Sequence, residues 1–127
     1  MLQRFAFIGR YSRPHFALWF LLGIALASRL PLLSLSLGEV DSGNFYNAIK
    51  YGYDITNFRP HAPGYPLYVF IAWSLNAVIK DPLLSLTLLS ALTGSLIVIP
   101  FYFLLRDLTG PRLAFFGGLL FMVNPLQ

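Results

Sequence analysis

A polar stretch at residues 38–68 holds the side chains of this chain that could do chemistry. It contains three of the five carboxylates, Glu39, Asp41 and Asp54, and one of the two histidines, His61. Long apolar stretches flank it on both sides. A carboxylate at the start of such a stretch can take a proton, and an imidazole near its end can bind an anion. We therefore treat this stretch as the candidate site.

A short surface helix is predicted directly after Asp41. Apolar side chains recur there at spacings of three and four residues, which places them on one side of a helix: Phe45, Tyr46, Ile49 and Tyr53. A helix of this kind after a membrane exit lies flat on the membrane surface. Two roles are then predicted for Asp41, and they do not exclude each other. The carboxylate can cap the helix by accepting backbone N–H bonds, and it can also face a cavity in which it takes a proton.

A proline-rich segment at residues 59–68 closes the polar stretch. Its three prolines fix the backbone and keep the residues before them out of helical conformations, so the segment is expected to be rigid and rich in turns. One interpretation is a stiff connector whose His61 meets lipid headgroups. The other is that His61 and Arg59 form hydrogen bonds to an anionic phosphate near the membrane surface.

The composition indicates a membrane protein. Of the 127 residues, 57% are hydrophobic and only 11% are charged, with a mean hydropathy of +0.66. A soluble domain carries about a quarter charged residues. The chain has no cysteine, which excludes disulfides and thiolate chemistry. Its net charge of +4 comes from dispersed basic residues, several of them beside apolar runs, so it does not indicate binding to nucleic acid.

The apolar runs predict an all-α fold of multi-spanning membrane helices around an extracytoplasmic loop that carries the short surface helix. The expected order is a transmembrane helix at about 14–37, the loop at 38–64, a short interfacial or spanning helix at 65–79, a transmembrane helix at 82–105 and the start of a further helix at 113–127. We expect these elements to form one partial membrane domain.

The basic residues predict the topology. Arg4, Arg10 and Arg13 precede the first apolar run without any acid, which places the N-terminus in the cytoplasm. The chain is then a multi-pass protein of the cell or inner membrane. The helix at 65–79 is shorter than the ~17–25 residues of a usual span. The residues 106–112 form a short basic hinge after the next apolar run. If the helix at 65–79 spans, this hinge lies outside the cytoplasm. If the helix lies in the interface, the hinge lies in the cytoplasm, as the positive-inside tendency favours.

The number of helices also predicts that this is the N-terminal piece of a longer protein. The last apolar run stops soon after it begins, and so few helices can hardly enclose a substrate cavity. We therefore expect residues 1–127 alone to be inactive.

Three stretches follow one another in an order that resembles a known superfamily. They are Asp41-Ser42-Gly43-Asn44-Phe45, His61-Ala62-Pro63-Gly64-Tyr65-Pro66-Leu67-Tyr68 and Leu89-Ser90-Ala91-Leu92-Thr93-Gly94-Ser95-Leu96. They are similar to an Asp-Ser-x-x-Phe loop signature, a His-Pro-Pro-Gly-Tyr-Pro-Leu-Tyr segment and a Leu-x-Ser-Ala-Leu-x-Gly helix start. Together they resemble the GT-C glycosyltransferases, which depend on polyprenyl-phosphate sugars and include the protein O-mannosyltransferases and the lipid A aminoarabinose transferases. The similarity covers nearly the whole chain.

The resemblance implies a reaction and roles for the site residues. Asp41 would be the base that takes the proton of an acceptor hydroxyl, while His61 and Arg59, with Lys50 as a weaker candidate, would bind the donor phosphate. The donor would be a polyprenyl-phosphate-linked sugar in membrane lipid; the acceptor is not identified. Many members carry an Asp-Glu pair where this chain has Ser42 after Asp41. A divalent metal held by Asp41 and Glu39 is therefore an open question, and no other cofactor is implied.

A non-catalytic membrane protein is the alternative. A transporter segment or a small structural subunit would explain the hydrophobic composition equally well. It would not explain why a polar, proline-stiffened loop lies between two apolar helices.

Overall fold

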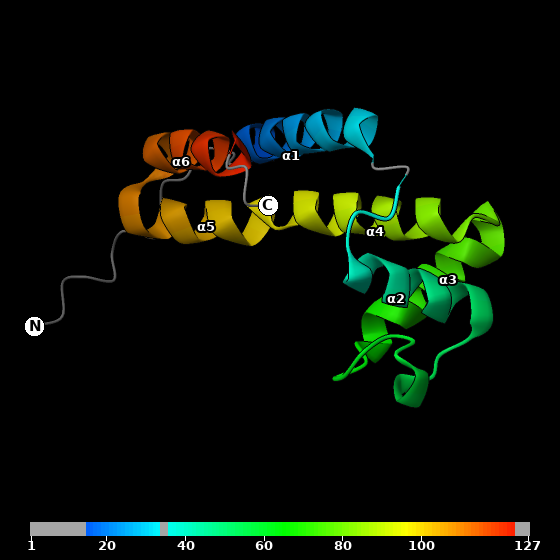
Figure 1. Cartoon of the computed structure of the whole chain (residues 1–127). Helices are drawn as coiled ribbons and strands as arrows, with labels where there is room; N and C mark the ends of the chain where they lie inside the picture. The colour runs from blue at the N-terminus through cyan, green and yellow to red at the C-terminus, as the bar shows by residue number, and fades with distance from the viewer. Residues whose placement is uncertain (1–14, 34–35, 124–127) are drawn as a thin grey trace, which may run out of the picture. The chain divides into compact units, whose positions relative to one another are not determined.

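The computed structural model describes residues 15–33 and 36–123, and the regular elements in these ranges are all helical (Figure 1). The α-helices are α1 (His15–Arg29), α2 (Val40–Tyr51), α3 (Pro66–Ile79), α4 (Pro82–Leu96), α5 (Val98–Thr109) and α6 (Pro111–Val123), with 3-10 turns at η2 (Leu30–Leu32) and η3 (Ile55–Asn57). The all-α prediction is confirmed. The residues used to orient the chain, Arg4, Arg10 and Arg13, lie outside the described ranges.

The chain divides into two compact units, which are described separately. One unit comprises Met1–Ala27 with Ser95–Gln127, and the other comprises Ser28–Gly94. The second unit contains the whole polar stretch that the sequence singles out.

In the first unit, α1, α5 and α6 share one apolar core. Its buried residues are Leu18, Leu21 and Leu22 of α1, Val98 and Tyr102 of α5, and Ala114 of α6. Helices α5 and α6 lie side by side (Figure 1), joined by Gly110 alone. Gly110 has φ +89° and donates its N–H to the carbonyl of Arg106 at 2.9 Å. The connection expected at 106–112 is therefore present but shorter than predicted, because α5 continues to Thr109 and α6 begins at Pro111.

In the second unit, α2 and α3 pack against the first turns of α4. The core consists of Ala48, Ile49, Val69, Ala72, Leu86 and Leu89. A hydrogen bond between the Tyr68 hydroxyl and Ser90 Oγ, 2.9 Å long, joins α3 to α4. Asp81 begins α4, since its Oδ1 accepts from the backbone N–H groups of Leu83 at 2.9 Å and Leu84 at 3.1 Å.

One described helix is long and apolar enough to cross a membrane. It is the run Pro82–Thr109, 28 residues, formed by α4 and α5. The helical hydrogen bonding is interrupted where α4 ends. In a continuous helix the Leu96 carbonyl would accept the backbone N–H of residue 100, but this residue is Pro100, which has no N–H. The apolar helices Phe16–Leu32, Pro66–Ile79 and Pro111–Met122 are shorter. The predicted span at 82–105 thus lies within this helix, while residues 14, 34, 35 and 124–127 of the predicted helices lie outside the described ranges.

Candidate functional site

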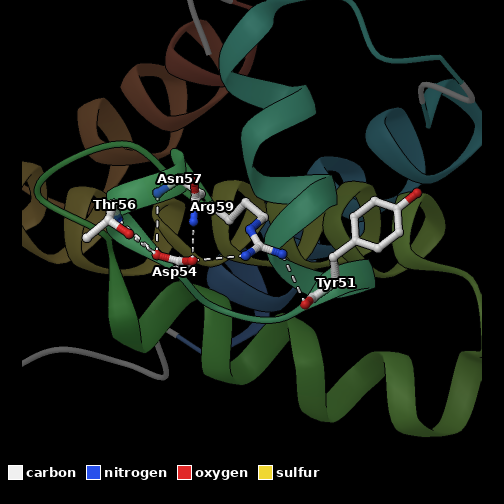
Figure 2. Close-up of polar contacts among 5 residues, drawn as sticks. All are labelled: Tyr51, Asp54, Thr56, Asn57 and Arg59. Carbon is white, nitrogen blue, oxygen red and sulfur yellow. Dashed lines mark hydrogen bonds and ion pairs between the residues drawn. The ribbon is translucent and has the colours of Figure 1, made fainter.

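The loop between α2 and α3 is built around Asp54. The backbones of Asp54 and Arg59 pair in both directions, with N–H to carbonyl distances of 2.7 and 2.8 Å. The Asp54 side chain also begins η3: its Oδ1 accepts from Thr56 N at 3.0 Å, Thr56 Oγ1 at 2.6 Å and Asn57 N at 3.3 Å. Its Oδ2 accepts from Asn57 Nδ2 at 2.6 Å. These contacts close the loop on itself (Figure 2).

The guanidinium of Arg59 completes this arrangement. Its Nη2 donates to Asp54 Oδ2 at 2.9 Å, and its Nη1 donates to the Tyr51 carbonyl at 3.2 Å, as Figure 2 shows. Its Nε is buried and has no hydrogen-bond partner within the described ranges. We call Tyr51, Asp54, Thr56, Asn57 and Arg59 the Asp54 network. Two of the three guanidinium nitrogens of Arg59, which the sequence assigned to a donor phosphate, are therefore engaged within the loop.

The Asp54 carboxylate is held in its ionised form. Hydrogen bonds from Thr56, then from Asn57 and Arg59, hold the pKa of the Asp54 carboxyl well below its usual range. Each of these bonds is made to the charged form, which lowers its free energy relative to the protonated form.

Asp41 does not cap α2. The cap position is Glu39, with φ −139° and ψ 160°, and the Glu39 side chain makes no capping hydrogen bond. The N–H of Gly43 bonds to the Glu39 carbonyl at 3.2 Å, so the helix begins two residues earlier than the sequence suggested. Asp41 therefore lies in the first turn, with 65% of its side chain exposed. The capping interpretation is wrong, but the carboxylate is still near the positive end of the helix dipole.

The fold brings Asp41 and His61 together. Asp41 Oδ1 lies 3.5 Å from His61 Nδ1, although 20 positions separate the two residues in the sequence. His61 Nδ1 is buried and makes no well-aligned hydrogen bond with any described residue. The side chain of His61 is 27% exposed, so its accessible surface lies away from Nδ1. The imidazole thus turns one nitrogen to Asp41 and can present its other edge to a ligand.

Aromatic rings enclose the imidazole. The centroid of the His61 ring lies 6.0 Å from that of Phe45 and 5.6 Å from that of Tyr65, in edge-on arrangements. The ring centroid of Phe45 also lies 5.5 Å from that of Tyr65 and 5.2 Å from that of Tyr68. These contacts join α2, the proline-rich segment and the start of α3. The imidazole of His61 therefore lies among aromatic side chains, with the carboxylate of Asp41 beside it.

The backbone around His61 turns sharply, as the three prolines predicted. The His61 carbonyl accepts from Gly64 N at 2.8 Å. Gly64 has φ +90° and Tyr65 has φ 43°, both left-handed, after which Pro66 starts α3. The peptide bonds before Pro60 and Pro63 are cis. The turn directs the chain from the Asp54 network into α3 within a few residues.

Lys50 is not part of this cluster. It lies nine residues after Asp41 on the same helix, about 13 Å along the axis. Its Nζ is 5.4 Å from the Tyr46 ring centroid and 5.2 Å from that of Tyr51. Interactions with Tyr51 and then Tyr46 raise the pKa of Lys50 above its ordinary value. The structure thus places this cation at the far end of α2 from Asp41.

Glu39 is exposed at the start of α2. Within residues 15–33 and 36–123, no three His, Asp or Glu side chains lie together as a metal site. Asp41 and His61 could each supply one ligand atom, and a divalent cation there would take further oxygen ligands from water or substrate.

The sequence did not assign a role to Asp54, although a signal for it was present. Asp54-Ile55-Thr56-Asn57 has the composition of an Asx turn, in which an aspartate side chain accepts bonds from backbone N–H groups two and three residues on. The pairing of this turn with Arg59 depends on the loop closing and is not visible in the local pattern.

Comparisons of the chain with protein-family models, with curated proteins and with solved structures found no match.

Proposed function

We propose that this chain belongs to an integral-membrane glycosyltransferase of the GT-C type, which moves a sugar from a polyprenyl-phosphate donor to an acceptor hydroxyl on the extracytoplasmic side. The proposal comes from the resemblance of three sequence stretches. The observation that carries it furthest is the 3.5 Å approach of His61 Nδ1 to Asp41 Oδ1, because the two residues with the most specific predicted roles lie side by side.

Asp41 has the properties of a proton acceptor. Its side chain is 65% exposed, and its Oδ1 lies 3.5 Å from His61 Nδ1. An acceptor hydroxyl could therefore reach the carboxylate. As the acceptor oxygen attacks the anomeric carbon, its proton passes to Asp41, the bond from the sugar to the phosphate oxygen breaks, and its electron pair stays on the phosphate.

His61 has the properties of a phosphate ligand. Nδ1 faces Asp41, and the accessible part of the ring lies on the other side. A protonated imidazole there would donate to a phosphate oxygen and stabilise the negative charge that develops on the leaving group. Arg59 and Lys50 stay secondary candidates, since Arg59 is engaged by Asp54 and Lys50 lies at the far end of α2.

The membrane topology belongs to the same proposal. The helix Pro82–Thr109 would cross the bilayer, and α1 with η2 would be part of another crossing, which makes the protein multi-pass. Helix α3 has 14 residues and would lie in the outer interface with its exposed Trp73 at headgroup level. The N-terminus would be cytoplasmic, which leaves Asp41 and His61 on the outer side.

The test is the turnover of Asp41→Asn in the full-length protein. Asparagine keeps the size of the side chain but cannot take a proton at neutral pH. We expect sugar transfer from a polyprenyl-phosphate donor to fall about 100-fold or more, while the Tm in detergent stays close to that of the wild type. Asp107→Asn, which removes an exposed partner of Arg106 in the other unit, is the matched control and should leave transfer unchanged. Near-normal transfer by Asp41→Asn would refute the proposed role of Asp41.

A further inference from the structure

Arg59 is fixed two residues before His61. Its backbone pairs with Asp54 through bonds of 2.7 and 2.8 Å, and its guanidinium reaches Asp54 Oδ2 and the Tyr51 carbonyl. Four contacts thus join Arg59 to residues five and eight positions earlier. These contacts hold Arg59 in place within the loop (Figure 2).

The residues on either side of His61 are fixed as well. Pro60, between Arg59 and His61, is fully buried. On the C-terminal side, the His61 carbonyl accepts a hydrogen bond from the N–H of Gly64 at 2.8 Å. A side-chain carbon built at Gly64 would meet the hydroxyl of Tyr53 and would lie 2.7 Å from Ile55 Cδ1. The loop that contains Asp54 is therefore packed against the turn that follows His61.

We propose that Asp54 is a positioning residue for His61: through Arg59 it holds the imidazole against Asp41 and the Phe45 and Tyr65 rings. Asp54 itself touches neither Asp41 nor His61 through any hydrogen bond or ion pair of the described residues. The consequence for catalysis rests on the proposed function; the positioning itself does not.

The bonding of Asp54 favours positioning over direct ligand binding. The side chain accepts five hydrogen bonds, three at Oδ1 and two at Oδ2, all from its own loop. A carboxylate offers about four lone-pair sites, so no acceptor capacity is left for a substrate hydroxyl or a metal ion. Asparagine at this position would keep one oxygen but could not accept from Arg59 Nη2 and Asn57 Nδ2 at the other.

The test follows the His61 ring by NMR in lipid nanodiscs. Residues 1–127 contain two histidines, so His15→Gln leaves His61 as the single imidazole of this segment. In that background we expect through-space cross-peaks from the His61 ring to the Phe45 and Tyr65 rings. Asp54→Asn should weaken or remove these cross-peaks at a temperature at which the protein is folded. A residue that only contributes stability would lower the Tm and leave the cross-peaks in place.

Two further variants keep the test decisive. Arg59→Met removes the guanidinium that donates to Asp54 Oδ2 and leaves the bonds from Thr56 and Asn57 in place. It therefore serves if Asp54→Asn does not fold, and it should weaken the same cross-peaks. Asp107→Asn removes the negative charge that pairs with Arg106 and should leave the cross-peaks unchanged. Unchanged cross-peaks in folded Asp54→Asn, or in Arg59→Met where it alone folds, would overturn the proposal.

A second measurement separates this inference from the proposed function. In the full-length protein, Asp54→Asn should raise KM for the polyprenyl-phosphate donor about tenfold, the effect of losing one hydrogen bond to a charged group, with a smaller change in kcat. If the wild type transfers no sugar but the cross-peaks respond as expected, the proposed function is wrong and the positioning role stands. If transfer occurs and Asp54→Asn changes neither KM nor the cross-peaks, the positioning role is wrong.

Discussion

At the residue scale, the two carboxylates of the candidate site have opposite surroundings. Asp54 accepts five hydrogen bonds from its own loop, whereas Asp41 is 65% exposed beside His61. A saturated carboxylate stabilises structure because its charge is already compensated. An exposed one can still exchange a proton with a ligand. This contrast is consistent with the proposed roles, in which Asp41 takes the proton and Asp54 supports the loop.

Asp54 should make the fold sensitive to acid. Its pKa is lower in the folded protein than in the unfolded chain, so its contribution to stability is complete above the ordinary aspartate value of about 3.9. The contribution is lost as the pH falls through the lower folded-state value. Between about pH 5.5 and about pH 2.5, the Tm of the wild type should fall more steeply than that of Asp54→Asn. Parallel Tm curves for the two proteins would contradict this prediction.

At the scale of elements, helix starts and turns set the direction of each segment. Asp81 caps α4 through Leu83 N and Leu84 N, and Pro82 follows at the first helical position, which needs no N–H donor. At the other end of α3, the left-handed Gly64 and Tyr65 turn the chain into the helix. Both devices are local, and each can be tested by one substitution.

The Asp81 cap predicts different effects of two substitutions. Asp81→Ala removes the acceptor of two backbone N–H groups and should lower the free energy of unfolding by about 1 kcal/mol. Asp81→Asn keeps a side-chain oxygen and should be nearly neutral. Thermal unfolding of both variants in detergent checks this. Equal losses in both variants would show that the charge of Asp81, rather than the cap, stabilises α4.

Gly64 should not tolerate a side chain. Its φ of +90° is strained for alanine, and an added carbon would collide with Tyr53 and Ile55. Gly64→Ala should therefore cost about 1–3 kcal/mol of stability. Gly43→Ala is the matched control, because Gly43 is helical and open, and alanine favours helix. The expected order of Tm is Gly43→Ala at or above the wild type and Gly64→Ala well below it.

At the scale of the whole molecule, one described helix can cross the bilayer by its length and composition. The 28 residues of Pro82–Thr109 extend about 42 Å at 1.5 Å per residue, more than the ~30 Å of the hydrocarbon layer. The 14 residues of α3 extend about 21 Å and fall short of it. The proposed topology, in which Pro82–Thr109 spans and α3 does not, places the polar loop before α3 and the Gly110 turn after α5 on opposite sides of the membrane.

Cysteine labelling in intact cells tests this topology. Residues 1–127 contain no cysteine, so Glu39→Cys and Thr109→Cys, both at exposed positions, each give a single reactive site within this segment. A membrane-impermeant thiol reagent should label the cysteine at position 39 in intact cells and the cysteine at position 109 only after lysis. Labelling at both positions before lysis would mean that α3 spans after all. The reverse pattern would place Asp41 and His61 in the cytoplasm.

Local physics allowed much of this protein to be predicted from its sequence. The composition indicated an apolar, helical protein; the spacing of Phe45 and Ile49 predicted α2; and the prolines predicted the turns around His61. These signals act over a few residues through backbone sterics and the helical repeat. The start of α2 was misplaced by two residues, because Asp41 is a good capping residue type and Glu39, the observed cap position, is not.

Tertiary structure alone decided which side chains meet. Asp41 lies beside His61 because α2 packs against α3 and the proline-rich turn returns to the start of α2. Arg59 pairs with Asp54 because the loop between them closes. Contacts of this kind depend on the packing register of separate segments, which hydrophobic periodicity leaves open. The sequence therefore determined the elements and their residues, and the packing of those elements determined that Asp41 meets His61 while Arg59 is engaged by Asp54.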